Sequence, residues 1–152
     1  MMLKKLCIAF CLMLGFQGVF AQAEVTDEEL KKYAVVMDSV DNMKADLIES
    51  ISEMVKNNEK VTAARYNELS KIINDETKLA EASAKPEEIE AIKEILKFKD
   101  EGTAKIQETF KTLATEHVGA AVFNKVKKAI AEDAETKAKY QEILAELKED
   151  SE

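Results

Sequence analysis

The sequence has few of the residues that form covalent links or metal sites: of 152 residues, two are cysteine, one is proline and one is histidine. A di-iron helical bundle takes a histidine from each of two helices, so the single His117 argues against that class of oxidase. Both cysteines, Cys7 and Cys11, lie near the start of the chain. The shortage of both residue types predicts a protein without a metal centre or a bound cofactor.

The first 23 residues have the three parts of a secretory signal peptide. Lys4 and Lys5 precede an apolar run, and small residues follow at Ala21 and Ala23. The run is shorter than the roughly 20 residues that a membrane-spanning helix needs. We therefore expect cleavage after Ala21 or Ala23, a periplasmic or secreted product, and no integral membrane segment in the mature chain. Both cysteines would leave with the signal peptide, so the mature chain would contain no disulfide.

Acidic residues outnumber basic ones, with 30 Asp and Glu against 22 Lys and Arg. Removal of Lys4 and Lys5 would leave 20 basic residues and a formal net charge of −10. A chain this acidic repels phosphate backbones and anionic lipids, which argues against nucleic acid as a partner. The remaining residues, 24–152, have the length of one ordinary domain.

A short segment occurs twice in the sequence: EKVTAARYN at 59–67 reappears as EHVGAAVFN at 116–124. Upstream of each copy stands a Glu-Glu pair followed by an aliphatic residue. Such self-similarity indicates a duplicated structural unit, and the two copies are expected to bury their apolar faces against each other. We therefore divide the domain into repeat one, 26–83, and repeat two, 85–148.

The first helix is predicted over 26–56, where apolar residues recur in steps of three and four. Thr26 can cap this helix, and Glu29 three residues later completes a capping box. Lys44 occupies the one heptad position that interrupts the apolar series.

The repeated segment is predicted to start a helix in each copy. Thr62 caps the second helix, and Val61 and Tyr66 have the spacing of a hydrophobic staple, in which a residue before the cap packs on one in the first turn. In repeat two, Val118 and Phe123 take the same two positions. The staples are therefore expected to fix how the chain enters both helices.

The complete pattern predicts an all-α fold, an antiparallel bundle of four helices built from two repeated helical hairpins. The second helix should end near residue 83, and Pro86 suits the first turn of the third helix. A polar stretch around Gly102 predicts a bend or a local loosening of that helix. The four helices either run alternately up and down within one chain, or two hairpins pair between chains. A homo-oligomer is therefore one of the two alternatives.

One ion pair is predicted to set the register of the first hairpin. In an antiparallel hairpin, residues equally distant from the turn lie at the same height, which places Lys44 opposite Asp75 and Glu76. Repeat two has Asp133 at the corresponding height. Such a pair would specify register more than it stabilises, because the cost of desolvation offsets most of the attraction. The alternative is that Lys44 extends to water along the edge of the bundle.

The stretch VTAARYNEL at 61–69, followed by Asp75 and Leu79, resembles the core motif of a bacterial family, the domain of unknown function 4168 family. The second copy keeps the pattern, with Phe123 for the tyrosine and Asp133 for the aspartate. The resemblance implies an exported, all-helical bacterial domain that contains two copies of the unit. It implies no particular activity.

Three classes of function are weighed. The favoured one is a non-enzymatic interaction or structural protein of the bacterial cell envelope, which binds another protein or a cationic polymer. The alternative is a small-ligand or lipid carrier that uses the bundle interior, and a hydrolase working through carboxylates is third. Small alanines alternate with large aliphatic residues as in a packed core, which favours the interaction protein. We expect no catalytic, cofactor-binding or metal-ligating residues, and assign structural roles to Val61, Thr62, Tyr66, Val118, Phe123, Lys44, Asp75, Glu76 and Asp133.

Overall fold

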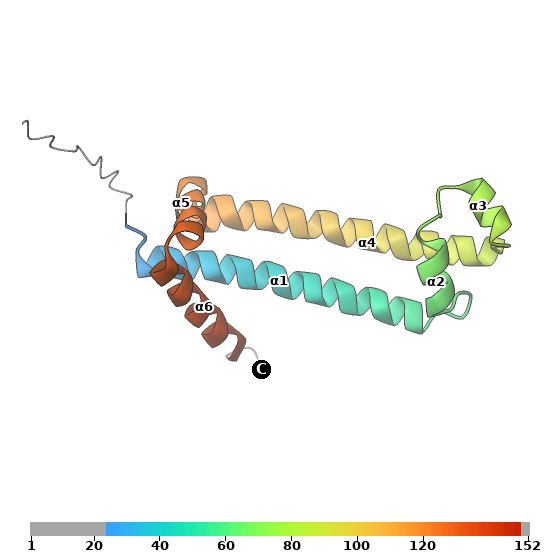
Figure 1. Cartoon of the computed structure of the whole chain (residues 1–152), viewed down its shortest axis with the longest axis horizontal. Coiled ribbons are helices and arrows are strands. Elements are labelled where there is room, and N and C mark those ends of the chain that lie inside the picture. The colour runs from blue at the N-terminus through green and yellow to red at the C-terminus, as the bar shows by residue number, and fades with distance from the viewer. Residues whose placement is uncertain (1–23, 150–152) are drawn as a thin grey trace, which may run out of the picture.

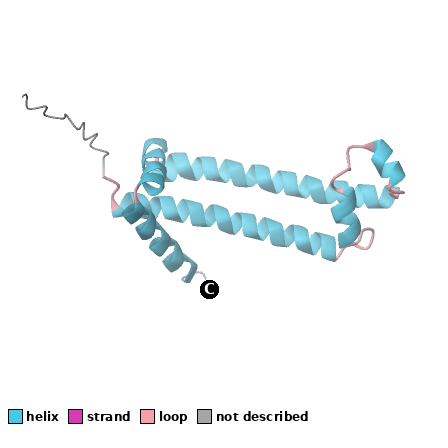
Figure 2. Cartoon of the chain, viewed as in Figure 1, coloured by secondary structure: helices cyan, strands magenta, loops and turns pink. Residues whose placement is uncertain are grey.

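The computed structural model describes residues 24–149, and within that range the fold is all-helical (Figure 2). The predicted signal segment, 1–23, lies outside the described residues. None of the helices in 24–149 is long and apolar enough to cross a membrane. The elements in chain order are α1 (Asp27–Lys56), α2 (Ala63–Leu69), α3 (Glu76–Glu81), α4 (Pro86–Thr112), the π-helix η1 (Leu113–Val118), α5 (Ala120–Glu132) and α6 (Ala134–Glu149).

Two long helices, α1 and α4, run antiparallel and form the body of the molecule (Figure 1). The start of α1 has the predicted capping box: the backbone N–H of Glu29 donates to the Thr26 hydroxyl, and the Thr26 N–H donates to the Glu29 carboxylate. Apolar residues at helical spacing bury one side of each helix, which is why the two pack together. The buried residues are Leu30, Tyr33, Ala34, Val36, Val40 and Val55 in α1, and Ala91, Ile92, Ile95 and Ile106 in α4.

The short helices gather at the two ends of this pair (Figure 1). Repeat one places α2 against the beginning of α4, and repeat two places α5 and α6 against the beginning of α1. Each repeat therefore covers the other, and each end has its own apolar cluster. Cluster one contains Val55, Val61, Leu69, Ile73, Leu79, Ala91, Ile92 and Ile95, and cluster two contains Leu30, Tyr33 and Val126.

This arrangement differs from a bundle of four full-length helices. The segment predicted as the second helix forms α2 and α3, and the segment predicted as the fourth forms α5 and α6. The breaks occur at Asp75 and Asp133, whose carboxylates accept hydrogen bonds from the backbone N–H groups of Lys78 and Thr136. An aspartate that caps a new helix competes with continuation of the previous one. The short helices α2, α3, α5 and α6 cannot pack along the full length of α1 or α4, so these two long helices pack against each other.

The predicted bend at Gly102 is not seen: α4 is continuous from Pro86 to Thr112 and has no visible kink (Figure 1). A β-carbon added at Gly102 would lie 2.5 Å from Cδ1 of Leu47. The glycine therefore serves close packing of α4 on α1 rather than bending.

Candidate functional site

An ion pair joins the two repeats at each end of the molecule. Glu29 and Glu88 occupy equivalent positions in the first turns of α1 and α4. Glu29 binds Lys125 of α5, and Glu88 binds Arg65 of α2, so each carboxylate meets a cation from the other repeat. The repeated Glu-Glu pair was the sequence signal for these positions, but it did not identify the cations.

Arg65 holds three elements together through a partly buried network. Its Nε–H donates to Glu88 Oε1 at 2.9 Å, and a second guanidinium nitrogen donates to Glu88 Oε2 at 3.1 Å. The same guanidinium also donates to the carbonyl oxygen of Ala82 and to the carboxylate of Glu68. The hydrogen bonds from Arg65, and next that from the backbone N–H of Lys85, lower the pKa of Glu88 to about 2. The network thus fixes α2 and the residues after α3 onto the start of α4.

The lowered pKa of Glu88 predicts a pH-dependent contribution to stability. Because folding favours the ionised form, this contribution is complete above the ordinary glutamate pKa of about 4.3. It is lost as the pH falls through the folded-state value of about 2. Glu88→Gln should therefore lower the melting temperature at pH 7, and the difference from wild type should shrink towards pH 2. Thermal melting curves of both proteins between pH 7 and pH 2 test this prediction. Glu90→Gln is the control, since Glu90 is exposed and lies 3.6 Å from Lys60; an equal trend there would contradict the prediction.

The opposite end contains the second ion pair and a group of aromatic rings. Lys125 Nζ donates to both carboxylate oxygens of Glu29 at 2.6 Å, and this bond lowers the pKa of Glu29. The Tyr33 ring lies between those of Phe123 and Tyr140, with centroid distances of 4.7 and 5.7 Å. Burial raises the pKa of both tyrosines, so both hydroxyls are protonated at neutral pH.

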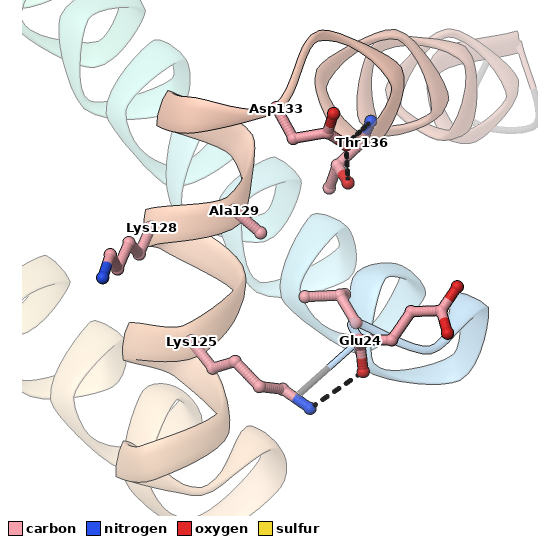
Figure 3. A pocket seen from close by; sticks show the side chains of 7 residues that line it. Glu24, Lys125, Lys128, Ala129, Asp133 and Thr136 are labelled. Atoms are coloured by element: carbon pink, nitrogen blue, oxygen red, sulfur yellow. Dashed lines mark hydrogen bonds between the residues drawn. The ribbon is translucent and has the colours of Figure 1, made fainter. Parts of the chain in front are cut away.

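A pocket of about 550 Å³ lies beside this ion pair, between the residues that precede α1 and the α5–α6 junction (Figure 3). The side chains of Lys125, Asp133 and Thr136 are already engaged. Lys125 binds Glu29 and reaches the carbonyl oxygen of Glu24, while Asp133 accepts hydrogen bonds from the backbone and hydroxyl of Thr136. Such a pocket is better explained as a helix junction than as a ligand site.

A second depression, here called the α1–α2 groove, has a volume of about 730 Å³ and lies between the C-terminal part of α1 and α2. Its floor includes the buried residues Val55 and Val61, and Ile48 stands at its rim with 68 % of its surface exposed. The lining residues are Ile48, Ile51, Ser52, Val55 and Lys56 of α1, Asn58, Val61 and Thr62 of the loop, and Ala63, Tyr66 and Asn67 of α2.

The lining of the α1–α2 groove contains no carboxylate, although the chain has 30 acidic residues. Its one charged group is Lys56, which has no ion-pair partner among residues 24–149. Ligand pockets commonly have volumes of about 300–1,000 Å³ and apolar walls with a few polar groups. The groove is therefore favoured as a candidate binding site over a larger depression of about 840 Å³ along the start of α4, whose lining includes Glu87, Glu90 and Glu94.

The repeated motif supplies part of the groove wall. Val61 is buried in cluster one, and Tyr66 packs against that cluster while it lines the groove. The Thr62 hydroxyl caps α2 by accepting from the backbone N–H of Arg65. In repeat two, Val118 is buried, and the Phe123 ring packs between those of Tyr33 and Phe110.

The predicted ion pair between Lys44 and Asp75 or Glu76 does not form, because Lys44 and Asp75 have other partners. Lys44 lies in the middle of α1 and binds Asp41, 2.9 Å away on the same helix. Asp75 caps α3 and pairs with Lys78, and Glu76 is the exposed first residue of that helix. The predicted pairing assumed that a long second helix runs along α1, whereas α2 ends at Leu69.

The carboxylates with a lowered pKa are arranged for capping and ion pairing. Hydrogen bonds lower the pKa of Glu28, Glu29, Asp75, Glu88 and Asp133, which keeps these carboxylates ionised at neutral pH. Ionised carboxylates suit caps and ion pairs rather than proton donation. Residues 24–149 contain no group of three or more His, Cys, Asp or Glu placed to hold a metal ion.

Comparison with known proteins adds no relative. No family model, no curated protein and no solved structure matches the chain. The resemblance to the domain of unknown function 4168 family, carried by the motif at 61–69, therefore stays a prediction.

Proposed function

We propose that this chain is a non-enzymatic, exported helical protein of the bacterial cell envelope that binds another protein through the α1–α2 groove. The observation that carries the proposal is the groove itself, an apolar surface without carboxylates on a strongly acidic chain. Ile48 supports it, because a protruding aliphatic side chain beside an apolar floor can anchor a partner. The rigid pair of α1 and α4 would present this surface at one end of the molecule.

Binding of the neutral apolar dye N-phenyl-1-naphthylamine tests whether the groove accepts an apolar group. Ile48→Asp should weaken the fluorescence response several-fold, because it places a charge at the apolar rim. Phe98→Asp is the matched control, since Phe98 is the other exposed large apolar side chain within 24–149, 39 % exposed, and does not line the groove. Equal loss in both variants, or no loss in Ile48→Asp, would contradict the proposal.

Export is tested by N-terminal sequencing of the protein recovered from the envelope or the medium. We expect the first residue to be Gln22 or Glu24, which follow the two predicted cleavage points. A protein that retains Met1 would contradict the predicted signal peptide.

A small-ligand or lipid carrier is the second candidate. The groove volume of about 730 Å³ favours it, because drug-sized ligands occupy pockets of this size. The structure offers a surface groove for this role rather than the predicted bundle interior. Native mass spectrometry of the purified protein distinguishes the two candidates. A stoichiometric bound lipid that Ile48→Asp removes would support the carrier.

A further inference from the structure

The two repeats are joined by a single short connection, so each can also pack on the other repeat of a second copy of the chain. We propose that two copies form a dimer by exchanging repeats, with repeat one of each copy packed on repeat two of the other. Such exchange is a low-cost route to a dimer, because the interface already exists within each copy. The partner that fits this surface is therefore the chain itself.

The contacts between the repeats are extensive, and exchange would preserve them. Helix α1 of repeat one packs on α4, η1, α5 and α6 of repeat two, and α2 of repeat one packs on α4. Three ion pairs also cross between the repeats: Lys125 with Glu29 at 2.6 Å, Arg65 with Glu88 at 2.9 Å, and Lys60 with Glu90 at 3.6 Å. Each of these contacts joins residues on opposite sides of the connection, so each can form between two copies.

The connection between the repeats is short, and its backbone is strained. Only residues 82–85 separate α3 from α4. Ser83 has a φ of 52° and is the one non-glycine residue of 24–149 with a positive φ. This left-handed conformation is unfavourable for a residue with a β-carbon. A short hinge under strain favours exchange of the elements that it joins, because the opened hinge releases the strain.

The connection also lies at a suitable place in the fold. It is found at the α3 end of the molecule, where α4 begins, so a second copy can extend outward from that end (Figure 1). Lys85 has an extended backbone, with a φ of −80° and a ψ of 148°, and the residue before a proline avoids the helical conformation. The opened connection therefore does not fuse α3 and α4 into one helix, and Ser83 and Ala84 are the hinge.

The inference goes beyond the proposed function and does not depend on it. The residues that line the α1–α2 groove lie between 48 and 67, so all of them belong to repeat one. Exchange would leave each groove intact, and the dimer would carry two. Failure of the dimer and failure of the groove are therefore separate results, because the loss of dye binding in Ile48→Asp does not require exchange.

Mixing of isotopes tests the exchange directly. Equal amounts of isotope-labelled and unlabelled protein are unfolded together in urea, refolded at high concentration and separated by size. Both fractions are then treated with a zero-length carbodiimide cross-linker, which joins Lys60 to Glu90 and Lys125 to Glu29. In the dimer, we expect heavy–light cross-links to be as frequent as light–light and heavy–heavy ones together. In the monomer, they should be absent.

The ion pair between Lys32 and Glu28 is the internal control, because both residues lie in α1. Its cross-links should join like labels in both fractions. A dimer whose cross-links between the repeats also join only like labels is held by surface contacts, and would overturn the inference. A protein that stays monomeric at every concentration after refolding would overturn it as well.

Substitutions at Ser83 test whether the connection is the hinge. Ser83→Gly relieves the strain of the closed connection and should lower the association constant of the dimer roughly tenfold. Ser83→Pro cannot adopt a φ of 52° and should raise it. Ser70→Gly is the matched control, since Ser70 ends α2 inside repeat one with an ordinary φ of −59°. Equal shifts in Ser83→Gly and Ser70→Gly would reject the hinge. If Ser83→Pro does not fold, the labelled wild type and Ser83→Gly still decide the result.

Discussion

Leu69→Ala is expected to lower the free energy of unfolding by about 3 kcal/mol, within the range for truncating a buried leucine. Leu69 is fully buried and is the one buried residue of α2. It contributes to cluster one, where it joins Val61 and Ile92 beneath the short helices. Because a seven-residue helix has little stability of its own, the cavity left by the leucine should also loosen α2. Urea unfolding followed by circular dichroism measures the change.

Lys71→Ala is the control for this prediction, since Lys71 is exposed directly after α2. It should change the free energy of unfolding by less than about 0.5 kcal/mol. The response to the dye gives a second readout, because loosening of α2 removes one wall of the α1–α2 groove. A loss below about 0.5 kcal/mol in Leu69→Ala would show that α2 is held in some other way.

Local signals in the sequence predicted much of the secondary structure. The first helix was expected over 26–56 and α1 spans Asp27–Lys56, because apolar periodicity and a capping box both act within a few residues. Pro86 likewise begins α4, where its missing amide hydrogen costs nothing. Such features need no knowledge of the rest of the chain.

The helix breaks also had a local signal, which a reading of apolar periodicity alone misses. Asp75 and Asp133 each accept a hydrogen bond from a backbone N–H three residues later, as helix-capping aspartates do. Both aspartates occupy matching positions in the two repeats, and the predicted role of Asp75 was an ion pair with Lys44. Treating both as caps would have placed the starts of α3 and α6, although not the end of α2 at Leu69.

The long-range arrangement could not be predicted, since it depends on which surfaces meet. Pairing of α1 with α4 follows only once the intervening helices are known to be short. The same holds for the candidate site: Val61 and Tyr66 were identified as a helix start, but the groove exists because α2 lies beside the end of α1.

Phe123→Ala is expected to lower the free energy of unfolding by about 3 kcal/mol, at the lower end of the range for buried phenylalanines because the ring is half-buried. Its ring lies 4.7 Å from that of Tyr33 and 5.5 Å from that of Phe110, and such aromatic contacts add about 0.5–1.5 kcal/mol per pair beyond burial. Phe123→Leu keeps most of the volume and should cost about half as much. Phe98→Ala, at an exposed phenylalanine of α4, is the control and should cost less than either variant.

The distance between the two clusters adds a sharper test of the same substitution. Phe123 belongs to the α5 end, whereas Ile92 lies in cluster one at the α2 end (Figure 1). Substitutions more than about 10 Å apart without shared partners are additive within about 0.5 kcal/mol. The double variant Phe123→Leu with Ile92→Val should therefore lose the sum of the two single losses, and mild substitutions keep it folded for measurement. A deviation above about 1 kcal/mol would mean that α1 and α4 couple the two ends, so that binding at the groove would be felt at the aromatic cluster.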